Sequence, residues 1–328
     1  MRALRWDGTR LVLARNVAEP ARRPGDALVR VHLAGICRTD LEITRGYLDF
    51  RGTLGHEWIG SVVAADDASL ISRRVVGEIN LPCGACPTCA AALGRHCTGR
   101  RVVGIVGADG AFADLLVLPA ANLHLVPDAI SDREAVFTEP VAAAYEIVEQ
   151  LRDVEGARVV VLGDGKLGLL VAQVLGAAGA RVRLAGRHAT KLARAAHLGI
   201  PTGEPEAGAD IVVDATGAPD GIARALALVR PRGTVVLKTT IAGRHAVDLA
   251  PAVINEVTIL GSRCGAFPPA LDALAAGRVR VAPLIDAMYP LEAGDRAFAH
   301  AATSGTLKVL IEPGCTPSAP RRPTPPRR

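Results

Sequence analysis

Aromatic side chains are scarce in this 328-residue chain: Phe, Trp and Tyr together make up 3% of it. Stacking on exposed nucleic-acid bases is therefore not an expected purpose. The sequence also lacks any run of about 18 uncharged apolar residues, so we expect no membrane-spanning helix. The first residues lack the apolar core and cleavage site of a signal peptide. Arg2 and Arg5 instead lie in a segment that is typical of a first strand.

Excess charge is concentrated at one end of the chain. The net charge is +5, but without Arg321, Arg322, Arg327 and Arg328 it falls to +1. The Pro-rich segment 314–328 is predicted to be a disordered basic tail. The rest of the chain is nearly neutral, so we expect neither a nucleic-acid partner nor a membrane partner.

The seven cysteines are unevenly spaced, and four of them fall within fifteen residues as C-x2-C-x2-C-x7-C. An odd number with such clustering indicates metal ligation in a reducing compartment, and we expect a cytoplasmic protein. Four thiolates can close a tetrahedron around Zn²⁺. An iron–sulfur cluster is disfavoured, because the wide last gap and the following Thr98 depart from the bacterial cluster pattern. The pattern predicts a structural zinc lobe over residues 80–100, with these ligands: Cys83, Cys86, Cys89 and Cys97.

The hydrophobic pattern changes character near Ser131. Before it, short alternating runs such as Ala27–Ala34 predict an irregular antiparallel sheet domain. After it, apolar strands alternate with helical segments, which predicts a parallel sheet with both faces covered. The expected strands and helices of this second unit begin at Arg158 and end at Gly261. Gly305–Ile311 is expected to return to the first domain.

A glycine-rich turn follows the first of these strands. Val159–Leu162 runs into Gly163-Asp164-Gly165-Lys166-Leu167-Gly168, a G-x-G-x-x-G loop between a strand and a helix. Such glycines allow a tight turn and close approach of a dinucleotide pyrophosphate to the helix N-terminus. Thr216 and Lys238 follow later strands of the sheet and should lie near the same cofactor, although Lys238 is also compatible with a surface position.

The end of the next strand bears on which dinucleotide binds. It reads Gly186-Arg187-His188, with Gly186 where an acid would bond the ribose of NAD. No carboxylate is expected there to repel a 2′-phosphate, and the Arg187 guanidinium suits a phosphate. The pattern favours NADP over NAD. The alternative is that Arg187 is a solvated surface residue and that either cofactor binds.

A second set of potential metal ligands is spread over three segments: Cys37-Arg38-Thr39-Asp40, Gly55-His56-Glu57 and Thr138-Glu139-Pro140. Each residue alone has an ordinary structural explanation, as a small core residue, a core histidine or a helix N-terminal acid. Their joint occurrence predicts a catalytic zinc site, which takes about three protein ligands and leaves one position open.

Together these motifs, in this order, resemble those of the zinc-containing medium-chain dehydrogenases/reductases, over about residues 1–313. The resemblance implies a GroES-like, mostly-β catalytic domain (1–149, completed by 263–313) and a Rossmann domain with a doubly wound parallel sheet (150–262). The overall class is α/β. The active site is expected in the cleft between the two domains.

The resemblance also implies roles for individual residues. Cys37, His56, Glu57 and Glu139 correspond to catalytic zinc ligands, with Glu57 also acting as an exchangeable acid at the metal. Thr39 corresponds to the hydroxyl that relays the substrate proton, and Asp40 to the acid that orients the ligand histidine. Arg38 corresponds to a residue near the cofactor pyrophosphate. A Glu at position 139 is similar to the polyol, glucose and threonine dehydrogenase branches. Glu42 stands where liver-type enzymes end the proton relay in a histidine.

The expected function is hydride transfer between NADP (or NAD) and a secondary alcohol, polyol or sugar, with two zinc ions per chain. The resemblance also implies a homodimer or homotetramer, because members of the family commonly pair the edge strands of their Rossmann sheets. One alternative is a catalytically silent family member that serves as a binding protein. The other is a zinc-independent quinone or enoyl reductase, although such enzymes lack the cysteine lobe and the Cys37/His56 pair.

Overall fold

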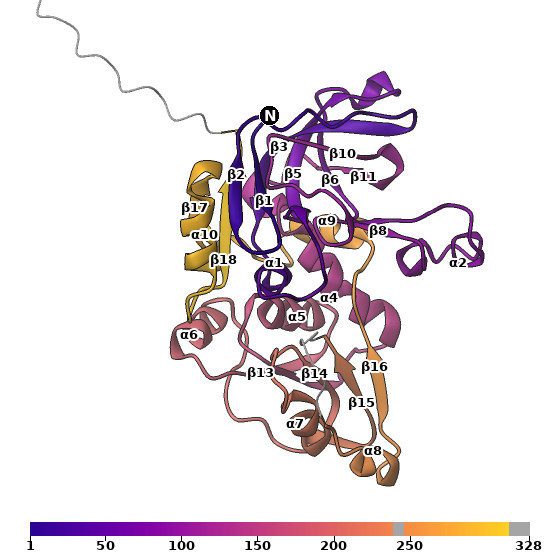
Figure 1. The fold of residues 1–328 in the computed structure, drawn as a ribbon. Coiled ribbons are helices and arrows are strands. Elements are labelled where there is room, and N and C mark those ends of the chain that lie inside the picture. Colours follow the sequence, from indigo (N-terminus) through magenta and orange to yellow (C-terminus); the bar gives the residue numbers. More distant parts are fainter. Residues whose placement is uncertain (239–245, 315–328) are drawn as a thin grey trace, which may run out of the picture.

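Two large β-sheets lie at opposite ends of the fold in Figure 1, with helices between them. The computed structural model describes residues 1–238 and 246–314. The predicted basic tail after Gly314, including Cys315, lies outside the described residues. No helix in the described ranges combines the length and apolar character needed to cross a membrane.

The first large sheet has seven strands in the order β11-β6-β5-β3-β18-β17, with β10 also paired to β3. Its strands are β3 (Asp26–Gly35), β5 (Glu57–Ala64), β6 (Arg74–Gly77), β10 (Leu115–Pro119), β11 (Leu123–Leu125), β17 (Ile285–Pro290) and β18 (Lys308–Glu312). β17 and β18 come from the C-terminal part of the chain, and β18 pairs antiparallel with β3. The sheet therefore joins the two ends of the described sequence.

Two small sheets flank this one. They are formed by β1 (Ala3–Trp6), β2 (Leu11–Ala14) and β4 (Gly52–Thr53), and by β7 (Asn80–Leu81), β8 (Arg101–Val103) and β9 (Gly107–Ala108). The segment between β7 and β8 projects from the body of the molecule and carries the short helix α2 (Pro87–Ala90) (Figure 1). The four clustered cysteines lie in this lobe.

The second large sheet is parallel throughout and has the strand order β13-β12-β14-β15-β16. Its strands are β12 (Arg158–Leu162), β13 (Arg181–Ala185), β14 (Ala209–Asp214), β15 (Val229–Leu237) and β16 (Thr258–Gly261). Central strands such as β12 and β14 are buried along most of their length because helices cover both faces of the sheet. The predicted α/β class, with a Rossmann-type parallel sheet, is confirmed.

The helices are α1 (Arg38–Ile43), α3 (Asp132–Ala135), α4 (Thr138–Leu151), α5 (Lys166–Ala177), α6 (Ala189–His197), α7 (Gly221–Leu228), α8 (Ala250–Ile254), α9 (Phe267–Ala275) and α10 (Gly294–Ala301). The spacing of apolar residues over Glu134–Leu151 predicts a single helix, but the structure has two helices, α3 and α4, in this region. Pro140 lacks the N–H that would continue the hydrogen bonds from α3, so a new helix begins at Thr138 with the proline in its first turn.

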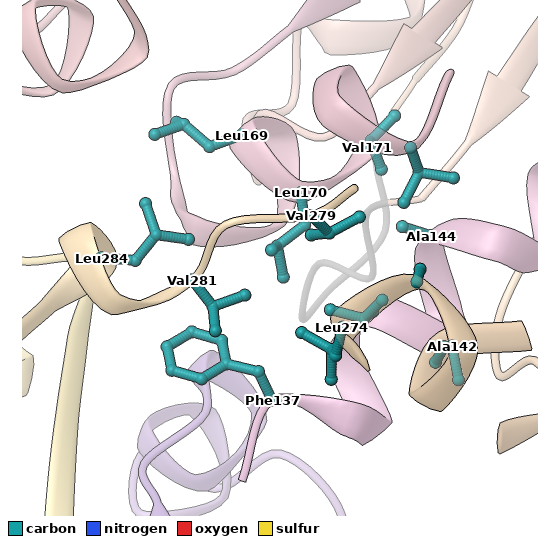
Figure 2. Close-up of a cluster of buried hydrophobic side chains, with 14 of the residues drawn as sticks. Phe137, Ala142, Ala144, Leu169, Leu170, Val171, Leu274, Val279, Val281 and Leu284 are labelled. Atoms are coloured by element: carbon teal, nitrogen blue, oxygen red, sulfur yellow. The ribbon is translucent and has the colours of Figure 1, made fainter. Parts of the chain in front are cut away.

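A single apolar cluster connects the two large sheets. Phe137, Leu170, Leu274 and Val281 belong to it, and Figure 2 shows these side chains converging between the helical segments. α4 packs against both α5 and α9. The cluster includes residues of β5 and of β12 as well. Because one continuous core spans both sheets, the edges of the sheets that face each other are held in a defined relative position.

Candidate active site

Three potential metal ligands meet where β3 ends and β5 begins. Cys37 follows β3 as the N-cap of α1, His56 directly precedes β5, and Glu57 is the first residue of β5. The two strands are antiparallel with Gly35 opposite Glu57, so the end of one lies beside the start of the other. The ligand atoms of Cys37, His56 and Glu57 lie within 4.8 Å of one another. A thiolate, an imidazole and a carboxylate together suit Zn²⁺.

Asp40 connects the two segments that carry these residues. Its side chain is fully buried, and its carboxylate accepts hydrogen bonds from the backbone N–H groups of Cys37 (2.8 Å) and Gly55 (3.2 Å). Oδ1 of Asp40 also lies 3.4 Å from Nδ1 of His56. An acid behind a ligand histidine commonly fixes the orientation of the ring, and Asp40 is placed for this role. Thr39 lies on the same turn, with Oγ1 3.9 Å from Sγ of Cys37.

Two lysines hold the Glu57 carboxylate. Oε1 forms an ion pair with Lys166 at the start of α5, and Oε2 forms one with Lys308 at the start of β18. The Lys308 and Glu57 side chains have no exposed surface. Lys308 also passes so close to Gly35 that a Cβ there would lie 2.2 Å from its Nζ. Lys166 lies on a helix that packs on the parallel sheet, whereas Lys308 lies in the seven-stranded sheet. Glu57 therefore links the two parts of the structure.

The charges around the cluster favour the ligand form of Cys37. Burial raises the pKa of its thiol, but the positive charges of Lys166 and His56 more than offset this and lower the pKa to about 6. Burial lowers the pKa of His56, while the negative charges of Asp40 and Cys37 raise it well above its usual value. At neutral pH Cys37 is therefore held as a thiolate, which is the metal-binding form.

A cleft of about 1200 Å³ opens in front of these residues. Cys37, Thr39, His56 and Glu57 line one part of it. Glu139, in the first turn of α4, lines the same cleft but lies outside the group of three whose ligand atoms converge. Its role as a fourth metal ligand stays a prediction.

The glycine-rich loop lines another part of the same cleft. Gly163 has a φ of +114°, and a Cβ there would lie 2.5 Å from the carbonyl oxygen of Ala215. A Cβ on Gly168 would collide with the carbonyl oxygen of Gly163 at 1.9 Å. Gly165, in contrast, faces open space. The loop is thus tightly packed on its inner side and accessible at Gly165, directly before the N-terminus of α5, as a pyrophosphate site requires. Lys166 and Leu167, which follow Gly165, also line the cleft.

The end of β13 differs from the sequence-based expectation. Gly186, Arg187 and His188 do line the cleft, but a carboxylate is present beside them. It belongs to Asp164 of the glycine loop, whose Oδ2 accepts hydrogen bonds from the backbone N–H groups of Arg187 and His188, both at 2.7 Å. The expectation that this corner lacks an acid was wrong, because it considered only the residues that follow β13 along the chain.

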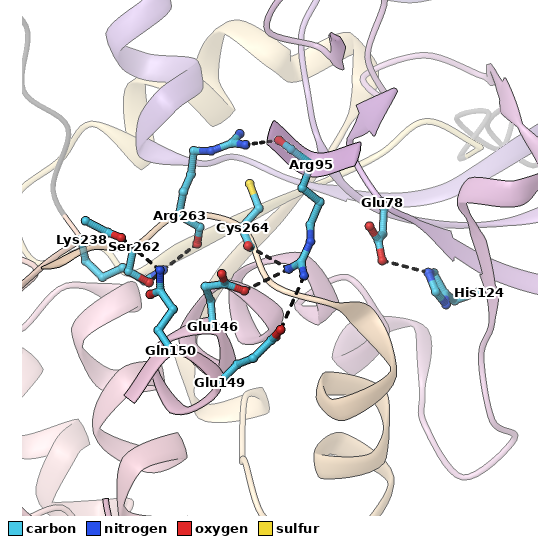
Figure 3. A network of polar contacts seen from close by, with 11 residues as sticks. Glu78, Arg95, His124, Glu146, Glu149, Gln150, Lys238, Ser262, Arg263 and Cys264 are labelled. Atoms are coloured by element: carbon cyan, nitrogen blue, oxygen red, sulfur yellow. Dashed lines mark hydrogen bonds and ion pairs between the residues drawn. The ribbon is translucent and has the colours of Figure 1, made fainter. Parts of the chain in front are cut away.

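The remaining candidate cofactor residues, Thr216, Lys238 and Arg38, also line the cleft and differ in their hydrogen bonds and exposure. Thr216 donates from Oγ1 to Asp214 at 2.7 Å, which shapes the turn after β14. Lys238 donates from Nζ to Ser262 Oγ (3.1 Å) and to the carbonyl oxygen of Arg263 (2.6 Å), as Figure 3 shows. Burial lowers the pKa of Lys238 to about 8. Arg38 is largely exposed at the rim and pairs with Glu42 at 2.8 Å.

The four clustered cysteines form the second potential metal site. Their sulfur atoms lie 3.5 Å (Cys86–Cys89 and Cys83–Cys97), 3.7 Å (Cys86–Cys97) and 3.9 Å (Cys83–Cys89) apart. Four sulfurs at a zinc–sulfur distance of 2.3 Å in a tetrahedron would be separated by about 3.8 Å. The four thiols are not joined in disulfides. The geometry fits a closed tetrahedral zinc site.

Two family models match the chain: the alcohol dehydrogenase GroES-like domain over residues 23–128, and the zinc-binding dehydrogenase domain over residues 167–276. The chain is 33% identical to the L-threonine 3-dehydrogenase of Streptomyces avermitilis, over 90% of this chain and 94% of the relative. It belongs to the zinc-containing medium-chain dehydrogenase family. It is also 28% identical to the sorbitol dehydrogenase of Halalkalibacterium halodurans, over 90% and 94% of the two chains.

Solved structures of this dehydrogenase family share the whole fold. A short chain alcohol dehydrogenase of E. coli CFT073, complexed with NADH, superposes with a TM-score of 0.87 at 26% identity, covering 95% of this chain and 99% of the other. A protein described as a zinc-binding dehydrogenase of Sinorhizobium meliloti 1021, bound to NADP, gives 0.86 at 29% identity with the same coverage. The predicted identity as an oxidoreductase of this family is therefore confirmed.

Three residues of this dehydrogenase's site were missed by sequence reasoning. Lys308 is the charged first residue of a strand that is otherwise apolar until Glu312, and this was the one signal for it in the sequence. Asp164 occupies a variable position of the glycine-loop motif, so nothing in the sequence indicated its contacts with Arg187 and His188. Arg95 joins the cysteine lobe to α4 by donating to Glu146 Oε2 at 2.9 Å, and its own carbonyl oxygen accepts from Arg263 (Figure 3). The lobe is thereby anchored beside the cleft.

Proposed function

We propose that this dehydrogenase transfers a hydride between NADP and the carbinol carbon of a small secondary alcohol, polyol or sugar. The observation that carries the proposal is that Cys37, His56 and Glu57 line the same 1200 Å³ cleft as the glycine loop. A polar substrate is supported by the relatives named for sorbitol and L-threonine. The cleft would bring the substrate hydroxyl and the nicotinamide ring together.

We assign the catalytic zinc to Cys37 and His56 with a carboxylate from Glu57 or Glu139. Zinc bound there would act as a Lewis acid on the substrate oxygen, and a bound nicotinamide would accept the hydride. Asp40 holds the His56 ring in the orientation for ligation. Thr39, whose hydroxyl lies 3.9 Å from the Cys37 sulfur on the cleft wall, is placed to accept the substrate proton and pass it outward.

The cofactor is assigned to the glycine loop and the ends of the parallel strands. The open face at Gly165 and the N-terminus of α5 would bind the pyrophosphate. We assign Thr216, Lys238 and Arg38, which line the same cleft, to the cofactor site as well. NADP is preferred in this proposal because the part of the cleft that we assign to the adenine end is lined by basic side chains. They are Arg187, His188, Lys191 and Arg224.

We also assign the structural zinc, the domain boundaries and the oligomeric state. We place the structural zinc in the cysteine lobe, which makes two zinc ions per chain. We also assign residues 1–149 with 263–313 to the catalytic domain and 150–262 to the dinucleotide domain, following the two large sheets. A homodimer or homotetramer is supported by exposed apolar side chains beside the edge strand β16, among them Val253 (76% exposed), Ile254 (78%) and Ile259 (37%).

The test begins with the zinc content of protein purified without chelator and re-equilibrated with zinc. We expect two equivalents for the wild type and one for Cys37→Ser. The same two proteins are then assayed against a panel of polyols and secondary alcohols with NADP and with NAD. Cys37→Ser should lose turnover but still bind dinucleotide, measured by fluorescence of the reduced cofactor.

The outcomes separate the alternatives. One zinc per chain in the wild type, with no turnover on any substrate, would favour the catalytically silent binding protein. Turnover that survives in Cys37→Ser would mean that the reaction does not use this metal site, as in a zinc-independent reductase. Two zinc ions with faster NAD-linked turnover would overturn the cofactor preference alone.

A further inference from the structure

In the corner between β13 and α6, the side chain of Asp164 occupies the space that a side chain at position 186 would need. A Cβ at Gly186 would lie 2.4 Å from Cβ of Asp164 and 2.5 Å from its Oδ2. The volume that a side chain at position 186 would need is thus filled by the Asp164 carboxylate. The acid that usually follows this strand in NAD-binding sheets is absent from position 186, and an acid from the neighbouring loop occupies its place.

The Asp164 carboxylate is almost fully engaged by the turn that it supports. Oδ2 accepts from the backbone N–H groups of Arg187 and His188, and Oδ1 lies 3.0 Å from Nδ1 of His188. The residue is only 6% exposed. A carboxylate offers about four lone-pair positions, and three donors already take most of them. Little acceptor capacity is left for a ribose hydroxyl.

The turn leaves the side chains of Arg187 and His188 accessible, although Nδ1 of His188 faces Asp164. Arg187 is 66% exposed and His188 is 42% exposed, and both line the cleft. Lys191 and Arg224 line the cleft as well. The Arg187 guanidinium pairs with Asp220, which lies 3.5 Å away and is itself half exposed. An exposed pair of this kind is weak, so the guanidinium can exchange it for a phosphate. His188 is also the N-cap of α6, which adds the positive end of a nine-residue helix.

We propose that Asp164 is a positioning residue for recognition of a ribose 2′-phosphate. Its buried carboxylate fixes the Gly186–His188 turn from beneath, so that Arg187 and His188 present their side chains to the phosphate. It does not accept a ribose hydroxyl as the acid after the second strand does in NAD-binding sheets. The inference rests on the NADP preference proposed above, and it explains how an acid and a phosphate site can share one corner.

The two possible roles of Asp164 predict opposite effects when it is removed. If the carboxylate orders the cationic turn, its loss weakens binding of a 2′-phosphate and leaves an unphosphorylated ribose almost unaffected. If it accepted ribose hydroxyls, its loss would weaken the unphosphorylated ligand and relieve repulsion of the phosphate. The preference for the 2′-phosphorylated ligand over the unphosphorylated one therefore falls in the first case and rises in the second.

The experiment uses the full-length, zinc-loaded protein and two probes that differ only in the 2′-phosphate: adenosine 2′,5′-bisphosphate and adenosine 5′-monophosphate. Calorimetric titration gives the Kd of each. In Asp164→Ala we expect the preference for the bisphosphate to fall by about tenfold, the order expected for disordering one charge-assisted contact. Asp164→Asn retains an acceptor oxygen for the backbone N–H groups and should retain part of the preference.

Arg187→Ala provides the test of mechanism. Because Asp164 acts through the turn, Asp164→Ala should change the preference much less in the Arg187→Ala background than in the wild type. A merely structural role would weaken both probes equally, which would overturn the proposal. So would a preference that rises in Asp164→Ala. A wild type that binds both probes equally would refute the NADP preference first, and with it this role. Zinc content and turnover with NAD report separately on the proposed reaction.

Discussion

Lys308 offers a stability test of the buried charges around the metal site. Its ammonium group and the Glu57 carboxylate form an ion pair in which neither side chain has exposed surface. Replacing Lys308 with Met leaves the shape similar but removes the charge on one side. Breaking a buried pair from one side costs about 3–5 kcal/mol. Lys166 still faces Glu57, so we expect the lower end, about 3 kcal/mol.

The assay is thermal unfolding of zinc-saturated protein at neutral pH. For a chain of this size a loss of 1 kcal/mol lowers Tm by about 2 °C, so Lys308→Met should lower it by about 6 °C. Lys191→Met, on the partly exposed face of α6, is the matched control and should change Tm by less than about 1 °C. Adding Glu57→Gln to Lys308→Met removes the negative charge that has lost its Lys308 partner and should restore about 1–2 kcal/mol.

The double variant separates charge from packing. If Lys308→Met lowers Tm and Glu57→Gln does not restore any of the loss, the ammonium group matters for its packing beside Gly35 and Phe137 and not for Glu57. A Tm within about 1 °C of the wild type, at unchanged zinc content, would refute the reasoning. It would mean that the Glu57 carboxylate is satisfied without Lys308.

Three further predictions test other parts of the structure. Cys97→Ser, at the buried cysteine of the lobe, should remove one zinc ion per chain as measured by elemental analysis, and an unchanged content would disprove the four-sulfur site. Gly165→Ala should weaken NADP binding at least about tenfold, because its Cβ would enter the open space at the start of α5. The same change at Gly176, on the exposed side of α5, should instead stabilise the protein by about 0.5–1 kcal/mol. Burial lowers the folded-state pKa of Lys238 to about 8, below the value of about 10.4 in an unfolded chain. Because the unfolded state then binds more protons, the stability of wild type relative to Lys238→Met should rise between pH 8 and about 10.4, and a flat difference in urea unfolding would contradict the shift.

Much of this dehydrogenase could be inferred from local sequence, because the relevant interactions are local. The four cysteines close around one metal within a fifteen-residue loop, so their spacing alone limits the geometry. The glycine loop lies between a strand and a helix that follow each other in the chain, and its conformation depends on those few residues. Alternation of apolar strands and helices likewise predicts the parallel sheet.

Other features depend on contacts between residues far apart in the chain. Lys308 reaches Glu57 only because β18 pairs with β3, with Leu310 opposite Gly35, and a one-residue change in that register would turn the side chain to the other face. Asp164 fills the space beneath Gly186 because β12 and β13 are neighbours in register. Hydrophobic periodicity shows which face of a strand is buried, but not which distant residue lies opposite. The sequence by itself therefore determined the fold class, the family and most of the metal and glycine motifs. Only the tertiary structure decided how the buried charges are paired, because pairing depends on strand register and packing.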